Sequence, residues 1–248
     1  MATETIAKPT VRLHHGDCLE FLKTLEPGSV DAVVTDPPYC SGGATEASRS
    51  QATHQGLRSE TIREGRSSWF EGDNMTTNGL LWLLRSVAVE SLKALRDGGS
   101  ILMFCDWRMA FAIGPAVESA GLRMRNLVVW DKGNPGLGNG FRPQHELILH
   151  FTRRSAEFHA VNVGNVIQSS RVHSTQKDHA CEKPVELMRK LISVVAPEGG
   201  TVLDPFMGSA TTGEACLDLG VNFIGCEADP KYFAIAKRRI DEASCTLF

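Results

Sequence analysis

The chain has 248 residues, 42% of them hydrophobic, with seven cysteines and a formal net charge of −3 at pH 7. This length suits one α/β domain with a sizeable core, and no run reaches the roughly 18 apolar residues of a membrane span. The scattered cysteines form neither a C-x-x-C pair nor a metal-binding pattern with histidine, so we expect no metal and a reducing, cytoplasmic location.

The first distinctive segment is a strand followed by a stiff loop. Residues 20–25 predict a short helix, and the apolar run 30–35 predicts a buried strand. Asp36, Pro37, Pro38 and Tyr39 come directly after it. Because each proline fixes its own φ and restricts the residue before it, this loop is stiff before any ligand binds.

Two hydrogen-bond acceptors on that loop suit a particular kind of ligand. The Asp36 carboxylate and the Pro37 carbonyl match the two hydrogens of a flat exocyclic amine such as N6 of adenine. Tyr39 offers a ring on which a base stacks for roughly 1–3 kcal/mol. Asp36, Pro37, Pro38 and Tyr39 are therefore predicted to be catalytic, although the motif alone leaves a strand-ending turn open as the alternative.

The middle of the chain alternates between loops, helices and strands. Residues 40–79, rich in Ser, Gly, Arg and Thr, predict a long loop insertion directly after this motif, and so long a loop in a compact domain is usually functional or mobile. Helices are expected over 80–95 and 109–120, a buried strand over 100–105, and an antiparallel hairpin of 127–130 with 146–151 at the sheet edge. This alternation is typical of a doubly wound α/β fold with a mostly parallel sheet.

Basic residues are concentrated in one part of the chain. Between residues 123 and 177 there are eight basic and three acidic residues, whereas the whole chain is acidic. Such an asymmetry is typical of phosphate contact, so we predict DNA-binding roles for Arg142, Arg153, Arg154 and Arg171. The alternative is that several of these arginines only solvate an exposed hairpin.

The last third of the chain predicts a nucleotide-type site. A helix is expected over 185–195 and a strand over 201–204, followed by a glycine turn, a helix over 209–219 and a strand over 222–226. Glu227 then lies about 20 residues after the turn, the usual place of an acidic group that binds ribose hydroxyls. Asp229 and Pro230 predict the start of another helix.

The glycine turn itself limits which nucleotide fits. Gly208 and Gly213 lack the dinucleotide spacing, and no lysine follows as a phosphate-binding loop requires. An adenosyl ligand without phosphates, such as S-adenosylmethionine, fits better. A purely structural turn between strand and helix is the alternative.

Taken together, the motifs and their order resemble those of the β-class S-adenosylmethionine-dependent DNA amino-methyltransferases of the N6-adenine type. The resemblance covers most of residues 11–240 and rests on these motifs: His15-Gly16-Asp17-Cys18, Asp36-Pro37-Pro38-Tyr39, Gly98-Gly99, Trp130-Asp131-Lys132, Glu182-Lys183-Pro184-Val185-Glu186-Leu187, Asp204-Pro205-Phe206-Met207-Gly208-Ser209 and Glu227.

The resemblance implies a fold, an activity and partners. It implies one Rossmann-like methyltransferase domain over 1–248 with a seven-stranded-type sheet, and a short target-recognition segment at about 133–180. The implied reaction is site-specific methylation of N6 of a flipped-out adenine in double-stranded DNA, as in restriction–modification. A homodimer on one duplex is compatible with it.

The resemblance also implies a cofactor site, at which the family often has glycine where this chain has Ala210. The implied S-adenosylmethionine-binding residues are Asp17, Cys18, Asp36, Lys183, Pro184, Asp204, Pro205, Phe206, Gly208, Ser209, Ala210, Glu227 and Ala228. Two other functions stay open. One is N4-cytosine methylation, for which the family more often has serine in place of Asp36, and the other is a non-catalytic partner that only binds cofactor or DNA.

Overall fold

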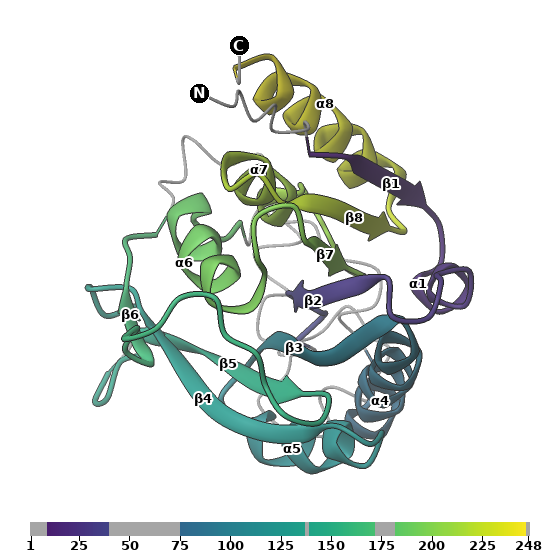
Figure 1. Cartoon of the computed structure of the whole chain (residues 1–248). Coiled ribbons are helices and arrows are strands. Elements are labelled where there is room, and N and C mark those ends of the chain that lie inside the picture. Colours follow the sequence, from purple (N-terminus) through teal and green to yellow (C-terminus); the bar gives the residue numbers. More distant parts are fainter. Residues whose placement is uncertain (1–8, 40–74, 137–138, 172–181, 247–248) are drawn as a thin grey trace.

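The computed structural model describes residues 9–39, 75–136, 139–171 and 182–246. Most of the expected 40–79 loop insertion and residues 172–181 of the target-recognition segment lie outside the described residues. Within them, the chain forms a sheet with helices on both faces (Figure 1).

Among the described residues, eight strands form one sheet in the order β1-β8-β7-β2-β3-β5-β4-β6. Every neighbouring pair is parallel except the two pairs made by β5. The strands are β1 (Val11–His15), β2 (Val30–Thr35), β3 (Leu95–Cys105), β4 (Arg123–Asp131), β5 (His145–Thr152), β6 (Val166–Gln168), β7 (Thr201–Asp204) and β8 (Asn222–Glu227).

Helices cover the two faces of the sheet. The helices are α1 (Cys18–Leu22), α4 (Thr77–Ala94), α5 (Ala110–Glu118), α6 (Val185–Val195), α7 (Thr211–Asp218) and α8 (Pro230–Thr246). Because side chains alternate along a strand, Val33 packs with α1, α4 and α5, whereas Val34 packs on the opposite face with α6, α7 and α8. The two apolar clusters confirm the doubly wound α/β fold.

The edge of the sheet differs from the expectation. Strands β4 and β5 do pair antiparallel, with Val128 opposite Ile148, but β6 adds a parallel strand outside β4. The hairpin is therefore not the edge, and the sheet has eight strands. Strand β6 has only three residues, which is too short for its alternation to be recognised in the sequence.

Helix α1 is shorter than the expected 20–25 and begins earlier. It starts at Cys18 because the Asp17 carboxylate accepts a hydrogen bond from the Glu20 N–H at 2.9 Å and so caps the first turn. It ends at Leu22, and Lys23 forms its C-cap. Asp17 therefore acts first as a helix cap.

The parallel strands bring four loops to one edge of the sheet, which we call the carboxyl edge. His15 of β1 lies opposite Glu227 of β8, and Asp204 of β7 lies opposite Gly225. The loops that follow β1, β2, β7 and β8 therefore emerge side by side. Ligands of open α/β sheets bind at this edge.

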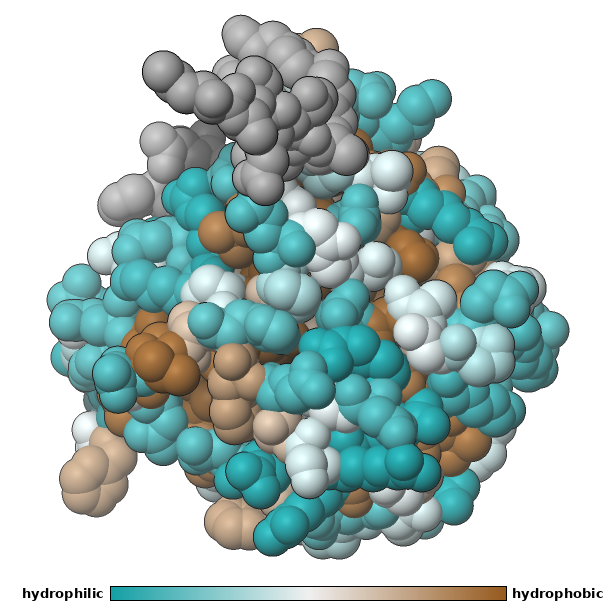
Figure 2. Space-filling view, in the orientation of Figure 1, coloured by the Kyte–Doolittle hydropathy of each residue, from teal (hydrophilic) through white to brown (hydrophobic). Residues whose placement is uncertain are grey.

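The surface is mostly polar. Figure 2 shows hydrophobic side chains scattered among hydrophilic ones on the face in view. Large exposed hydrophobic residues include Trp82, Trp107, Phe111 and Phe141. Within the described ranges, no helix combines the length and apolarity needed to cross a bilayer.

Candidate active site

Asp36 stands at the carboxyl end of β2 with one oxygen paired and one not. Its Oδ2 accepts a hydrogen bond from Lys183 Nζ at 2.6 Å. Among the described residues, its buried Oδ1 has no partner. Because a buried acceptor without a partner costs about 1–3 kcal/mol, this oxygen is suited to a donor brought by a ligand.

Glu146 connects the groups around Asp36. Its Oε2 accepts from the Tyr39 hydroxyl at 3.1 Å and lies 3.2 Å from Lys183 Nζ. Its Oε1 accepts from Lys132 Nζ at 2.5 Å. Two carboxylates and two ammonium groups thus form one charge-balanced network.

The sequence reasoning did not assign Glu146 to the site. Strand β5 runs opposite to its neighbours, so its first residues, not its last, lie at the carboxyl edge. The available signal was a charged residue near the start of an otherwise apolar strand, HELILHFT. Such a residue near a strand end is usually solvated, and only the strand direction shows that it faces Lys183.

Burial and charge together set the protonation of the network. Burial raises the pKa of Asp36 above its usual range, although Lys183 opposes that shift. Burial also acts to raise the pKa of Glu146, but the ammonium groups of Lys183 and Lys132 outweigh it and lower that pKa. Burial raises the pKa of Tyr39 well above its usual range, so its hydroxyl stays protonated and donates to Glu146.

Lys183 is enclosed by aromatic rings as well as by carboxylates. Its Nζ lies 5.1 Å from the ring centres of Tyr39 and Phe104, and the side chain is 5% exposed. A cation over a ring face is stabilised electrostatically. Lys183 thus packs against Tyr39 and pairs with Asp36, which links the two halves of the predicted site.

The turn after β7 is held from within by Asp204. Its Oδ1 accepts from Thr35 Oγ1 at 2.7 Å and from the Phe206 N–H at 3.1 Å, and its Oδ2 accepts from Thr212 Oγ1 at 2.7 Å. Burial raises the pKa of Asp204 to about 7. Asp204, predicted to bind cofactor, therefore shapes the turn and joins it to β2.

Glu227 meets the same turn from β8. Its Oε2 accepts from the Gly208 N–H at 2.9 Å and its Oε1 from the Asp229 N–H at 2.9 Å. Each carboxylate oxygen has two lone pairs, so both oxygens keep an acceptor position for ribose hydroxyls. The predicted pairing of a glycine turn with an acidic residue is therefore present in space, and it fits an adenosyl group.

Ala210 closes this turn in a strained conformation. Its φ of 62° and ψ of 37° are left-handed, and the residue is fully buried. Left-handed backbone costs an L-residue roughly 1–2 kcal/mol, which explains why glycine is favoured here. Alanine is small enough to occupy the position.

We expect Ala210→Val to destabilise the fold by about 2–4 kcal/mol, because a β-branched side chain in this conformation adds overpacking to strain. The melting temperature should fall by roughly 4–16 °C in calorimetry. Ala210→Gly is the control, since relief of strain and loss of a buried methyl nearly cancel. A valine variant that melts with the wild type would contradict the strained geometry.

The residues after β1 lie beside Glu227. The Gly16 N–H donates to the Glu227 carbonyl at 3.0 Å, and the Cys226 thiol donates to the Gly16 carbonyl at 3.3 Å. Asp17 is exposed, whereas Cys18 is buried, and burial raises its pKa to about 12. Cys18 is thus a neutral packing group. The predicted cofactor residues from β1, β7 and β8 therefore converge at one edge.

The four arginines predicted to bind DNA lie at opposite edges of the sheet. Arg142 and Arg171 are exposed in segments that follow β4 and β6 at the carboxyl edge, and Arg171 Nη2 donates to the Asn134 carbonyl at 3.3 Å. Arg153 and Arg154 follow the far end of antiparallel β5. The Arg153 N–H donates to the Gly99 carbonyl of β3. Gly99 lies about five strand residues, or roughly 17 Å, before the point on β3 that is level with Asp36.

The Arg153 side chain also makes contacts within the fold. Its Nη1 donates to the Leu92 carbonyl at 2.8 Å and to the Leu95 carbonyl, and its Nε lies 2.8 Å from Asp97 Oδ1. Arg154 pairs with the same carboxylate. These contacts hold the end of α4 against β3. That Arg153 and Arg154 contact DNA phosphates stays a prediction, at the edge of the sheet opposite Asp36. In the described part of the chain, no cluster of three metal-ligating side chains occurs.

Comparisons with known proteins agree with this geometry. A family model described as DNA methylase, N6_N4_Mtase, matches residues 30–238. Type II methyltransferase M.HpaI of Haemophilus parainfluenzae is 27% identical over 93% of this chain and 74% of that protein. M2.DpnII of Streptococcus pneumoniae, also a Type II methyltransferase, is 26% identical over 92% of this chain and 89% of that protein.

Solved structures show the same fold. The crystal structure of the M1.HpyAVI–SAM complex has a TM-score of 0.70 and 26% identity, covering 94% of this chain and 100% of that one. The cytosine-N4-specific PvuII DNA methyltransferase has a TM-score of 0.72 at 16% identity, covering 96% and 92%, which shows the fold alone.

Proposed function

Because this chain belongs to the DNA methylase family, we propose that it methylates N6 of a flipped-out adenine in double-stranded DNA. The chain is an S-adenosylmethionine-dependent DNA methyltransferase. The proposal concerns the target atom and the residues that hold it. The buried, unpartnered Oδ1 of Asp36 is the observation that carries it.

Asp36 and its loop suit the amine rather than the methyl donor. An amine inside a duplex is unreachable, so the base leaves the stack at a cost of a few kcal/mol. The Asp36 carboxylate and the Pro37 carbonyl then accept the two N6 hydrogens and hold the nitrogen. Bound S-adenosylmethionine supplies an electrophilic methyl on a sulfonium. As the nitrogen forms its bond to that methyl, the carbon–sulfur bond breaks and its electrons stay on sulfur.

The network around Asp36 keeps it in the state that this role needs. Lys183 stabilises the carboxylate as an acceptor at 2.6 Å, against the effect of burial. The amine becomes acidic only after methylation, and its proton then passes to solvent water. Asp36 therefore acts through position and charge more than through basicity, and such electrostatic preorganisation is often the largest catalytic contribution.

N4 of cytosine is the alternative target, because that amine also presents two hydrogens on a flat ring and the family model covers both reactions by name. Asp at position 36, where the cytosine enzymes more often have serine, favours adenine by resemblance. Transfer of a labelled methyl group to DNA, followed by nucleoside analysis, tests the proposal. Formation of N6-methyladenine supports the proposal, whereas formation of N4-methylcytosine shows that cytosine is the target. Absence of label from both bases indicates that the protein is a non-catalytic partner.

Arg142 and Arg171 are the proposed phosphate contacts, and we expect their joint reversal to glutamate to weaken binding to every duplex alike. Each lost phosphate contact should flatten the salt dependence by about 0.9 log unit per tenfold change in salt. S-adenosylmethionine affinity should stay unchanged. Titration of labelled duplexes at several salt concentrations measures both slopes.

Arg154→Glu provides the discriminating comparison for that experiment. Arg154 is 74% exposed and lies at the opposite edge of the sheet. If Arg154→Glu flattens the salt slope and the double reversal does not, the DNA surface lies at that opposite edge instead.

The biological setting is proposed from the same comparisons. The relatives named above are Type II methyltransferases, which supports a role in restriction–modification and a cytoplasmic location where DNA is accessible. We also propose that two copies share one duplex. Sedimentation of the protein with and without a short duplex distinguishes one bound copy from two.

A further inference from the structure

Glu146 contacts Lys132 and also Lys183 and Tyr39, the two groups beside Asp36, yet holding the amine does not require it. We propose that Glu146 is a positioning residue, which holds Lys183 and Tyr39 in place and thereby sets the orientation and charge of Asp36. This inference rests on the proposed function, since it assumes that Asp36 accepts the target amine.

The geometry of Lys183 supports this role. A lysine side chain is a flexible stem with a point charge, so one hydrogen bond to Asp36 does not define its position. The second carboxylate, Glu146, lies 3.2 Å from Nζ on another strand. Glu146 also accepts a hydrogen bond from the Tyr39 hydroxyl at 3.1 Å, so it holds the end of the Asp36 loop beside Lys183.

Charge balance supports it as well. Lys132 and Lys183 are 15% and 5% exposed, and Glu146 is 21% exposed, so solvent screens the network only weakly. Without the Glu146 charge, Lys132 would lose the carboxylate that it contacts at 2.5 Å, and Lys183 would lose the one at 3.2 Å. Removing one partner from a buried ion network leaves uncompensated charge and displaces what remains.

The negative charge of Glu146 also acts on the titration of Asp36. The groups around Glu146 are Lys132 after β4, Lys183 before α6, Asp36 and Tyr39 after β2, and Cys105 at the end of β3. Burial keeps the Tyr39 hydroxyl and the Cys105 thiol protonated at neutral pH. The charge of Glu146 helps to raise the pKa of Asp36, so neutralising Glu146 should lower the pKa of Asp36. The acid limb of the pH–kcat profile should then move to lower pH.

Glu146→Gln is the principal test, with the pH–kcat profile as the deciding measurement. We expect kcat to fall about 10–100-fold, since displacement of catalytic groups by an ångström costs up to about that much. The KM for S-adenosylmethionine should stay within about twofold, and the acid limb should move to lower pH. Unchanged kcat together with an unmoved acid limb would overturn the inference.

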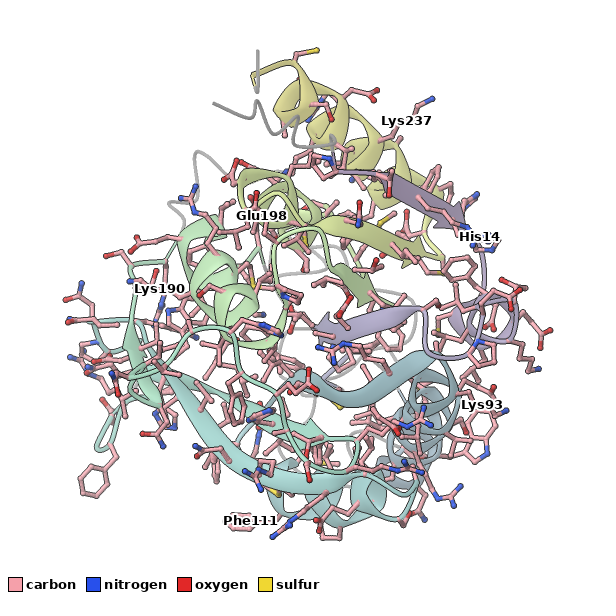
Figure 3. All side chains as sticks on the ribbon, viewed as in Figure 1. His14, Lys93, Phe111, Lys190, Glu198 and Lys237 are labelled. Carbon is pink, nitrogen blue, oxygen red and sulfur yellow. The ribbon has the colours of Figure 1, made fainter. Side chains whose placement is uncertain are left out.

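Glu90→Gln is the matched control. Glu90 pairs with Lys93 at 2.7 Å, is 16% exposed, and lies on α4 away from the site, where Figure 3 labels Lys93. The Glu90→Gln substitution removes an equally enclosed carboxylate and should leave kcat and the pH profile as in the wild type. A similar acid-limb shift in Glu90→Gln would show that the effect is not specific to Glu146 and would overturn the inference.

Glu146→Asp separates charge from position and decides the matter if Glu146→Gln does not fold. It keeps the charge, so the acid limb should match the wild type, but its shorter side chain should lower kcat. Wild-type kcat in Glu146→Asp would overturn the positioning role. Asp36→Ala in the same assay keeps the two proposals apart: an active Asp36→Ala refutes the proposed function, whereas an inactive one beside a wild-type Glu146→Gln refutes only this inference.

Discussion

Asp36→Ala should lower methyl transfer at least about 100-fold while leaving S-adenosylmethionine binding largely intact. The variant loses the carboxylate whose buried Oδ1 has no hydrogen-bond partner among the described residues. A charged hydrogen bond is worth about 1.5–3 kcal/mol, and misplacement of the reacting nitrogen adds to that loss. Single-turnover transfer of a labelled methyl group to DNA measures the rate, and calorimetry measures the cofactor affinity.

The variant should still fold, because Lys183 keeps Glu146 as a partner at 3.2 Å. Asp36→Asn keeps one acceptor oxygen but loses the charge that pairs with Lys183, so its rate should lie between those of Asp36→Ala and the wild type. Asp218→Ala, at an exposed ion pair with Arg189, is the control for loss of a surface carboxylate. Turnover above about a tenth of the wild-type value in Asp36→Ala would exclude the proposed role.

Glu227→Ala should weaken S-adenosylmethionine binding by roughly 10–100-fold, with smaller effects on kcat at saturating cofactor. The carboxylate is expected to accept ribose hydroxyls while it already accepts from the Gly208 and Asp229 N–H groups. Loss of charged hydrogen bonds costs about 1.5–3 kcal/mol. Isothermal titration with S-adenosylmethionine measures the change directly.

Glu198→Ala is the matched control for this experiment. Glu198 is exposed in the loop between α6 and β7, at the edge of the sheet opposite the cofactor turn, and Figure 3 labels it. Its loss should leave cofactor affinity within about twofold. Unchanged affinity in Glu227→Ala would remove that residue from the site and leave the turn after β7 without its acidic partner.

Local patterns were enough for the main parts of the fold. The strands 30–35 and 201–204 and the helix 185–195 match the observed bounds, because their apolar runs are bounded by proline, glycine or charged residues. The left-handed conformation of Ala210 was not predicted from the sequence, in which only the alanine at a position where the family often has glycine was noted.

The antiparallel insertion of β5 accounts for most of what the sequence did not predict. Residues 146–151 were recognised as a strand, but hydrophobic alternation is the same in either direction and does not show which end of a strand faces the site. Once β5 lies between β3 and β4, its first residues join the active site and its last residues lie at the opposite edge. Glu146 was missed for this reason, and the same strand direction places Arg153 at the edge opposite Asp36.

The sequence by itself determined the class of fold, the stiff loop at Asp36 and the pairing of a glycine turn with Glu227, because each depends on residues close together in the chain. Only the tertiary structure decided that Asp36, Lys183 and Glu146 form one network, since 147 positions separate Asp36 from Lys183. Contacts of that kind depend on strand order and direction. These are determined by packing over the whole sheet and are not encoded in any short segment.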